Sequence, residues 1–222
     1  ETIYHVVWDD VADWFVEVSK VEQNINMNAY VLDAILRLSH PFAPFVTETI
    51  WQALPWHDTI LAGEAWIKPA KYDDIAAGQF GRLKNLVSEA RYVMSELPGN
   101  KRYGMLYMDD SLVADNAELI QKLARVKSVE HVDQARGLRL AASGRDAWLD
   151  LDDDTLYEHQ TNLEKRLANV RQQVKTLEAR LANENYIAKA PAHLVEETRR
   201  QLAEEQALIK RLQTELQVIA RS

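Results

Sequence analysis

Lysine and arginine recur along the last third of the sequence at spacings that place them on the outer faces of helices. Ten of them lie between positions 165 and 211: Lys165, Arg166, Arg171, Lys175, Arg180, Lys189, Arg199, Arg200, Lys210 and Arg211. Cations on a rigid support suit phosphate groups, so this pattern could bind a polyanion such as RNA. Charge alone, however, favours a solvated helix face with local ion pairs, such as Lys175 beside Glu178.

The net charge is uneven along the chain. The formal charge is −8 overall, yet residues 155–222 hold 11 basic and 9 acidic side chains while residues 1–154 hold 15 and 25. A basic tail on an acidic body argues against a generally basic nucleic-acid binder and favours an anionic partner at the tail only.

Other side chains that could carry chemistry lack the partners they would need. His40 has no nucleophile at a suggestive spacing, and Asp9, Asp10, Asp13 and Glu17 fit a solvated helix face better than a metal site. The acidic run at 150–154 lacks the glycine and distal glutamate of a calcium loop. No phosphate-binding loop, dinucleotide fingerprint or hydrolase motif occurs. We therefore predict no catalytic residue and no metal site.

The sequence contains no cysteine and no apolar run of membrane-spanning length. Disulfides and thiolate metal sites are excluded, which favours a cytoplasmic setting without membrane contact. The chain begins at Glu1 without a signal-peptide pattern, and we expect this end to be a cut through a larger protein.

The basic residues of the tail need a support, and the apolar pattern there predicts two helices. One seam runs Leu156, Gln160, Leu163, Leu167, Val170, Val174, Leu177, Leu181, and a second runs Val195, Thr198, Leu202, Glu205, Ile209, Leu212, Leu216, Ile219. Steps alternating between four and three residues are typical of a coiled coil. Pro191 lies between the seams and suits the first turn of a new helix. Residues 154–222 are therefore predicted to form an antiparallel coiled-coil hairpin, about 45 Å long at ~1.5 Å per residue.

Local signals refine this hairpin. Thr155 and Glu158 fit a capping box at its start. Thr198 and Glu205 interrupt the second seam and are expected to fix the register of the two helices.

Residues 1–98 are predicted to form a helical bundle. Apolar stripes of helical spacing cover residues 4–54, interrupted where Pro41 and Pro44 end a helix, and Thr47 is expected to cap the next one. Four tryptophans before residue 57 suggest a bulky core. An irregular stretch at 55–74 precedes a helix over 75–97.

Residues 99–153 are predicted to form a small α+β joint. Strands are expected within 101–108, 128–132, 137–142 and 147–151, with one helix capped by Ser111 and running to about Arg125. The fold class is therefore mainly α: a helical bundle, a small α+β joint and the hairpin. A catalytic α/β domain hidden in residues 99–153 is an alternative, although the piece is small for one.

Three stretches carry a resemblance to a known family. "LRLSHPFAPFVTETIWQAL" resembles the H-P-F-x-P-F-x-T-E-E-x-W-Q segment in the anticodon-binding domain of class I aminoacyl-tRNA synthetases for valine, isoleucine and leucine, with Thr49 in place of the second Glu. "WDDVADWFVEVSK" and "NENYIAKAPAHLVEETRRQL" are similar to runs of the valine enzymes, and the second lies in a final hairpin that the other two enzymes lack. The chain thus resembles the C-terminal part of valyl-tRNA synthetases (valine–tRNA ligases).

The resemblance implies a tRNA-binding role without chemistry. The bundle would contact the anticodon stem and loop and the hairpin the tRNA elbow, supporting ATP-dependent attachment of valine to tRNA(Val) by an absent N-terminal catalytic domain. ATP and Mg²⁺ would belong to the parent enzyme, expected to be a monomer, and no cofactor to this chain, which should be inactive alone. The rival hypothesis is a structural coiled-coil interaction or dimerisation module without RNA binding.

The resemblance also selects residues for RNA contact. On the hairpin these are Arg166, Lys175, Arg180, Arg199, Arg200 and Lys210, together with Lys189 in the matching K-A-P motif, which could equally stabilise the hairpin tip. In the body they are Arg91, Lys101 and Arg102. Which side of the hairpin would face RNA stays open at this stage.

Overall fold

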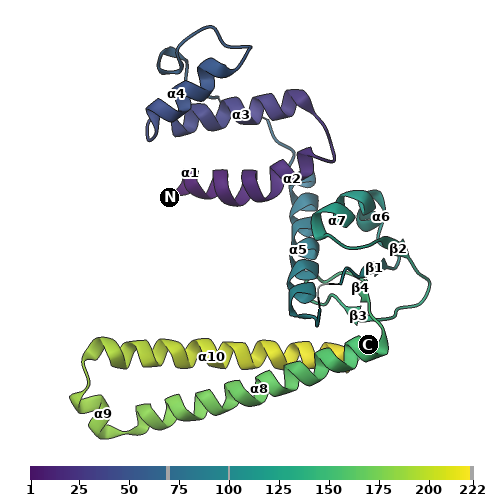
Figure 1. The fold of residues 1–222 in the computed structure, drawn as a ribbon, viewed down its shortest axis with the longest axis vertical. Helices are drawn as coiled ribbons and strands as arrows, with labels where there is room; N and C mark the ends of the chain where they lie inside the picture. The colour runs from purple at the N-terminus through teal and green to yellow at the C-terminus, as the bar shows by residue number, and fades with distance from the viewer. Residues whose placement is uncertain (69–70, 100, 221–222) are drawn as a thin grey trace. The chain divides into compact units, whose positions relative to one another are not determined.

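The computed structural model describes residues 1–68, 71–99 and 101–220, which form two compact units, Glu1–Gly78 and Gln79–Ser222 (Figure 1). Helices dominate both units, and a small mixed sheet lies in the second. The predicted fold class, mainly α with a small α+β region and long C-terminal helices, is therefore confirmed. The predicted domain boundaries after residues 98 and 153 stay predictions.

The first unit begins with one continuous helix. It comprises α1 (Thr2–His5), a π-helical segment (Val6–Phe15) and α2 (Val16–Ser19). The backbone N–H of Val16 donates to the carbonyl of Val11, five residues earlier, which is the wider π spacing. Helix α3 (Ile25–Ser39) follows, and the Asn24 side chain caps it by accepting from the Met27 N–H.

Helix α4 (Pro44–Ala53) begins earlier than predicted, so the expectation that Thr47 caps it is wrong. Pro44 occupies the first turn, where a missing N–H costs no hydrogen bond. Thr47 therefore lies inside the helix, where its buried hydroxyl donates to the Ala43 carbonyl (2.9 Å). His40 Nδ1 lies 2.8 Å from the same hydroxyl, which gives this histidine a structural contact.

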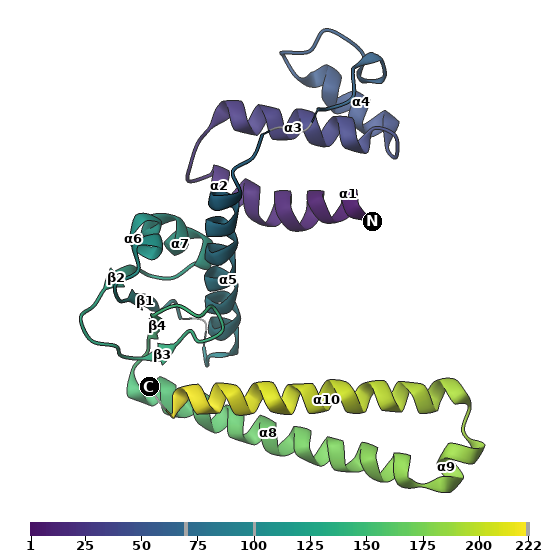
Figure 2. The ribbon, with the colours of Figure 1, turned by 180° about the vertical axis from the view of Figure 1, so that it is seen from behind.

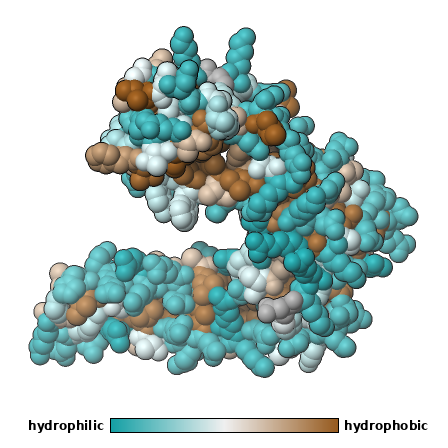
Figure 3. Space-filling view, turned by 45° about the horizontal axis from the view of Figure 1, so that its top comes forward, coloured by the Kyte–Doolittle hydropathy of each residue, from teal (hydrophilic) through white to brown (hydrophobic). Residues whose placement is uncertain are grey.

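The core of the first unit is smaller than the tryptophan content predicts. Leu36, Trp51 and Leu61 form it, and the Trp51 indole N–H donates to the Thr59 carbonyl (2.9 Å). Trp8, Trp56 and Trp66 instead remain 60%, 51% and 62% exposed. The prediction that the early tryptophans form one bulky core is wrong for Trp8 and Trp56, and hydrophobic residues gather on the surface of this unit (Figure 3).

The second unit contains most of α5 (Asp74–Glu96) and a four-stranded sheet. The strands are β1 (Gly104–Tyr107), β2 (Val129–His131), β3 (Leu138–Arg139) and β4 (Ala147–Asp150), in the order β2-β1-β4-β3. Strand β1 is parallel to β2 and antiparallel to β4, with Met105 opposite Leu149. All four predicted strands are present.

The predicted single helix after Ser111 is divided in two. Helices α6 (Ser111–Asp115) and α7 (Ala117–Ala124) meet at Asn116, and Arg125 ends α7 in a left-handed conformation (φ 59°). Asp110, not Ser111, caps α6 by accepting from the Val113 N–H. The expected Ser111 cap is wrong because the preceding aspartate offers the same kind of acceptor one residue earlier.

The predicted hairpin is confirmed. Helices α8 (Asp153–Ala182) and α10 (Ala192–Ile219) run antiparallel along each other, and the short α9 (Glu184–Lys189) joins their far ends (Figures 1 and 2). We call α8–α10 the arm. Most residues of its two buried rows come from the predicted seams: Leu163, Leu167, Val170 and Val174 on α8, and Val195, Thr198, Leu212 and Ile219 on α10.

The ends of the arm helices correct two details. Asp152 caps α8 by accepting from the Thr155 N–H (2.7 Å), so the predicted Thr155 capping box is wrong and Thr155 is buried inside the helix. Pro191 lies one position before α10, as its cap residue, and is preceded by Ala190 in an extended conformation. The proline therefore breaks the helix where predicted.

Gly137 provides a test of how β3 is held against β4. Its φ is +80°, and a Cβ at this position would lie 2.1 Å from the Leu149 carbonyl oxygen. Gly137→Ala is therefore expected to lower the free energy of unfolding by about 2–4 kcal/mol, since backbone strain and a steric clash add. Urea unfolding followed by circular dichroism measures this loss.

Gly144→Ala is the matched control for Gly137→Ala. Gly144 also has positive φ (+68°), but no atom lies within 4 Å of the added Cβ. Only the conformational cost of about 1–2 kcal/mol should remain. Equal losses in the two variants would show that the contact with Leu149 plays no part.

Candidate nucleic-acid interface

The tip of the arm holds two of the sequence-predicted residues. Arg180 lies over the Tyr186 ring, with 5.9 Å between its guanidinium carbon and the ring centroid. The Tyr186 hydroxyl is 2.8 Å from Thr198 Oγ1 and also donates to the Leu194 carbonyl (3.2 Å). Lys189 is exposed at the end of α9. Tyr186 thus joins α9 to α10 at the tip, and Arg180 from α8 packs against the same ring.

The middle of the arm carries the most accessible predicted cations. Lys175 and Lys210 are exposed, and no ion pair involves either side chain within the described residues. Arg199 lies 3.7 Å from Glu196, and Arg200 lies 3.7 Å from Glu204. Such exposed pairs are weak and exchange readily for a phosphate contact.

The root of the arm is tied to α5 by charged and aromatic groups. The Arg211 guanidinium lies 3.8 Å above the Tyr92 ring, its Nε donates to Glu215 (3.2 Å), and the Tyr92 hydroxyl donates to the same carboxylate (3.4 Å). Arg166 forms an ion pair with Glu96 at the end of α5. We call Tyr92, Arg211 and Glu215 the root cluster. It positions the arm, and Arg166, a predicted RNA contact, is engaged beside it.

A cavity of about 370 Å³ lies at the same root. Apolar side chains such as Val93, Leu138 and Val218 form much of its wall, and His159 reaches it from α8. His159 is only 4% exposed, and its Nδ1 has no hydrogen-bond partner among the described residues. Burial lowers the pKa of His159, and the nearby Glu215 and Glu96 oppose this shift only in part. The imidazole is therefore held in its neutral form at the arm root.

The three predicted RNA contacts outside the arm differ in exposure and in their partners. Arg91 is half-buried on α5, and its Nε donates to the Leu123 carbonyl (2.7 Å), which ties α5 to α7. Lys101 and Arg102 are exposed just before β1. These three predicted contacts therefore lie on α5 and just before β1, outside the arm.

One exposed cation of the arm was not among the predicted RNA contacts. Arg171 is exposed on α8 one turn from Lys175, and no ion pair involves its side chain in the described part of the chain. Its position four residues before Lys175 on the same helix, which places both on one face, could have identified it from the sequence.

The described residues contain no group of three or more histidine and acidic side chains that could hold a metal ion. None of the described helices is both long and apolar enough to span a membrane.

Comparisons with known proteins fit the two helical parts of the chain. Residues 1–102 match the family model described as "Anticodon-binding domain of tRNA ligase", and residues 156–220 match "Valyl tRNA synthetase tRNA binding arm". Proteins named valine–tRNA ligase are similar along almost the whole chain. The relative from Thermotoga maritima is 33% identical over 96% of this chain, that from Deinococcus radiodurans 32% over 96%, and that from Streptomyces avermitilis 30% over 97%.

These relatives are much longer than this chain. The matched regions cover 26%, 24% and 26% of the Thermotoga, Deinococcus and Streptomyces proteins, so the chain spans about a quarter of their length.

The buried His159 predicts a pH-dependent arm root. The protonated form is disfavoured in the folded state, so His159 favours folding fully above its ordinary pKa of 6.5 and loses this contribution as the pH falls from there through the lowered value. The wild-type chain should therefore lose stability relative to His159→Gln between pH 7.5 and 5. Thermal unfolding at both pH values measures the difference in Tm between the two proteins.

His193→Gln provides the control for this pH dependence. His193 is exposed near the start of α10, so replacing its side chain should change folding little. A constant Tm difference between wild type and His159→Gln across the pH range would contradict the prediction.

Proposed function

The chain belongs to the valine–tRNA ligase family and matches its C-terminal, non-catalytic part, and on this premise we propose that its task is to hold tRNA(Val). The attachment of valine to that tRNA, with ATP and Mg²⁺, would be carried out by other parts of the parent enzyme. The chain itself would supply binding energy and orientation, which an enzyme can use to position its substrate for reaction.

The observation that supports this proposal is the shape and surface charge of the arm. It is an extended hairpin whose buried apolar side chains lie mostly in one seam, so its flanks can present polar side chains to a partner. Exposed cations lie along these flanks, including Lys175, Arg199, Arg200 and Lys210. Phosphate contacts position a folded RNA without reading its bases, and we assign the arm to the tRNA elbow in this way.

The first unit would serve the anticodon stem and loop. The match to an anticodon-binding domain covers this unit and continues to residue 102, where Lys101 and Arg102 are exposed. The exposed aromatic residues of this unit support a second role for its surface. Tyr4, Trp8 and Phe42 line a groove of about 540 Å³, and apolar surface of this kind commonly marks a contact site. We assign this surface to the catalytic part of the same ligase, in a monomeric enzyme of the cytoplasm.

The rival function is a coiled-coil dimerisation or interaction module without RNA. It would need unsatisfied apolar surface along the arm, and the two rows of the seam are already buried against each other. The exposed large hydrophobic residues of the arm, Tyr157, Ile187 and Leu194, lie near its two ends and do not form a continuous stripe.

Salt dependence separates these functions. The isolated chain is expected to bind a tRNA(Val) transcript weakly, with the Kd rising steeply between 50 and 200 mM salt, because each phosphate contact releases counterions. Fluorescence anisotropy with labelled tRNA measures the Kd, and analytical ultracentrifugation of the same samples measures self-association.

Two results would contradict this function. One is binding that salt does not weaken. The other is concentration-dependent dimerisation that is lost when residues 155–219 are removed, which would support the structural module. Valine-dependent pyrophosphate exchange by the chain alone would instead reveal a catalytic site in residues 99–153, and we expect none.

A further inference from the structure

We propose that only one flank of the arm, a cationic face formed by Arg171, Lys175 and Lys210, contacts the RNA phosphates. This inference rests on the proposed function and names the side of the arm that performs it. The opposite flank, which we call the groove face, is lined by Gln173 and Gln201 and is assigned no RNA contact.

A hydrogen bond across the hairpin marks one flank of the arm. Gln206 Nε2 donates to Glu178 Oε1 (3.4 Å), so these two residues lie on the same flank. Gln173 and Leu177 of α8 line the same groove as Gln201 and Glu205 of α10, so these two stretches face each other. Because the helices are antiparallel, Lys210, five residues toward the root from Glu205, lies near the level of Ala168 and about one turn from Arg171.

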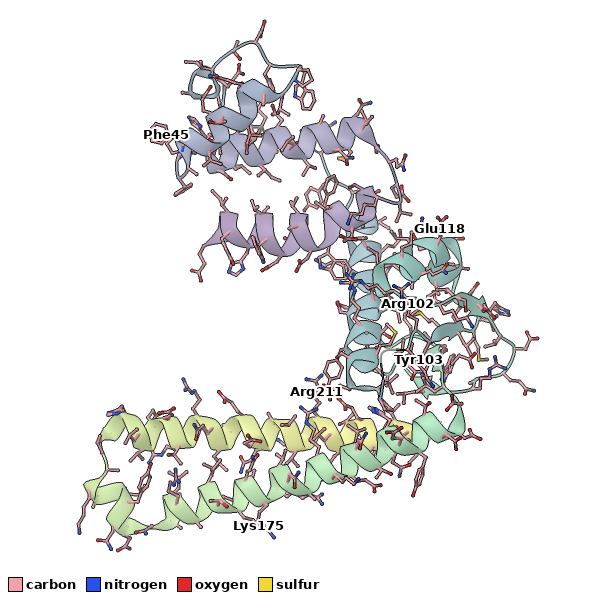
Figure 4. The ribbon with its side chains drawn as sticks, in the orientation of Figure 1. Phe45, Arg102, Tyr103, Glu118, Lys175 and Arg211 are labelled. Atoms are coloured by element: carbon pink, nitrogen blue, oxygen red, sulfur yellow. The ribbon has the colours of Figure 1, made fainter. Side chains whose placement is uncertain are left out.

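Helical spacing then places all three cations on the flank of that hydrogen bond. Lys175 is three residues and Arg171 seven residues before Glu178 on α8, and Lys210 is four residues after Gln206 on α10. Arg199, seven residues before Gln206, shares this flank but pairs with Glu196. Residues separated by three, four or seven positions share one face of a helix. The three side chains therefore lie along one flank of the arm, with Arg171 between Lys210 and Lys175. Figure 4 shows Lys175 directed away from α10, whereas Arg211 points from α10 toward α5.

The cationic face has positive charge that the described part of the protein does not neutralise. All three residues are exposed, and no ion pair or side-chain hydrogen bond involves any of them there. Glu178 shares the flank, but it accepts the hydrogen bond from Gln206. A polyanion with closely spaced charges is the partner that this arrangement fits, and tRNA is the polyanion that the proposed function supplies.

The groove face is unsuited to phosphate at the same level of the arm. A shallow groove of about 410 Å³ is lined there by Gln172, Gln173, Thr176, Leu177, Gln201 and Glu205, without a lysine or arginine. One carboxylate oxygen of Glu205 is buried and has no hydrogen-bond partner in the described residues. An incoming phosphate would meet negative charge at this position.

The arginines of the groove face are already engaged within the protein. Arg166 and Arg180 lie one heptad on either side of Gln173, and they contact Glu96 and the Tyr186 ring. Arg211, four residues before Glu215 on the same flank of α10, belongs to the root cluster with Tyr92. The two flanks thus divide their tasks: the groove face attaches the arm at its root and closes its tip, and the cationic face stays free.

The test compares matched variants of the whole chain binding a tRNA(Val) transcript. Arg171→Gln/Lys175→Gln/Lys210→Gln removes the cationic face and keeps residues of good helix propensity. This variant should bind tRNA at least ten-fold more weakly at 100 mM salt. The slope of log K against log salt should become less steep by about 2–3, because about 0.9 ion is released per phosphate contact. Circular dichroism should show an unchanged Tm, since the three side chains are exposed.

Two controls accompany this variant. Lys122→Gln/Lys127→Gln/Arg136→Gln removes the same charge from exposed positions outside the arm and should change the Kd by less than about two-fold with an unchanged salt slope. Gln173→Glu/Gln201→Glu adds two negative charges to the groove face. Its effect should be several-fold smaller than that of the cationic-face variant.

The outcomes separate this inference from the proposed function. If wild type shows no salt-sensitive binding, both fail. If wild type binds but the cationic-face variant binds equally well, or the groove-face variant loses as much affinity, the one-flank assignment is wrong and the tRNA-binding function stands. Displacement of tRNA by polyglutamate of equal charge would show a general anion surface and overturn the assignment to RNA.

Discussion

A single row of side chains on each helix holds the arm together, and this seam is the constraint on which its other properties depend. A two-helix hairpin has no second layer, so Leu167, Val170 and Leu212 must bury their surface against the facing helix or not at all. Polar seam positions must then find partners locally. The Thr198 hydroxyl does so with Tyr186 and the Leu194 carbonyl, which makes the tip part of the same seam. Everything outside the seam is available for other uses.

The seam gives the arm stiffness, but the root gives it direction. A rod that joined the body only through the turn before α8 could swing, and contacts by Tyr92 and Glu96 from α5 oppose this at two points. His159 adds a buried residue on α8 at the same place. These residues need not contact RNA to affect its binding, because an arm that is fixed in advance loses less conformational entropy when it binds.

The sequence was sufficient to predict the elements whose pattern is local and periodic. The arm, its break at Pro191 and the four strands follow from apolar spacing and turn residues, which neighbouring elements reinforced here. Helix caps were harder to predict because Asp110 and Asp152 compete with Ser111 and Thr155 within three positions, and aspartate, serine and threonine are all good caps. The prediction that the early tryptophans form one core failed for another reason. Periodicity places Trp8 on a helix face, but burial requires a partner surface that local sequence does not specify.

The same limit explains why the sequence could select arginines and lysines but not a flank. Each flank of the hairpin carries three or more cations at heptad spacing, so the pattern on α8 and α10 is nearly symmetric. The asymmetry comes from residues far away in sequence: Glu96, which pairs with Arg166, is 70 positions from it, and Tyr92 is 123 positions from Glu215. Once these partners occupy one flank, a cation's availability depends on the fold more than on its own sequence context. Charge that the fold leaves unpaired, as at Arg171, Lys175 and Lys210, is therefore a better guide to the interface than charge alone.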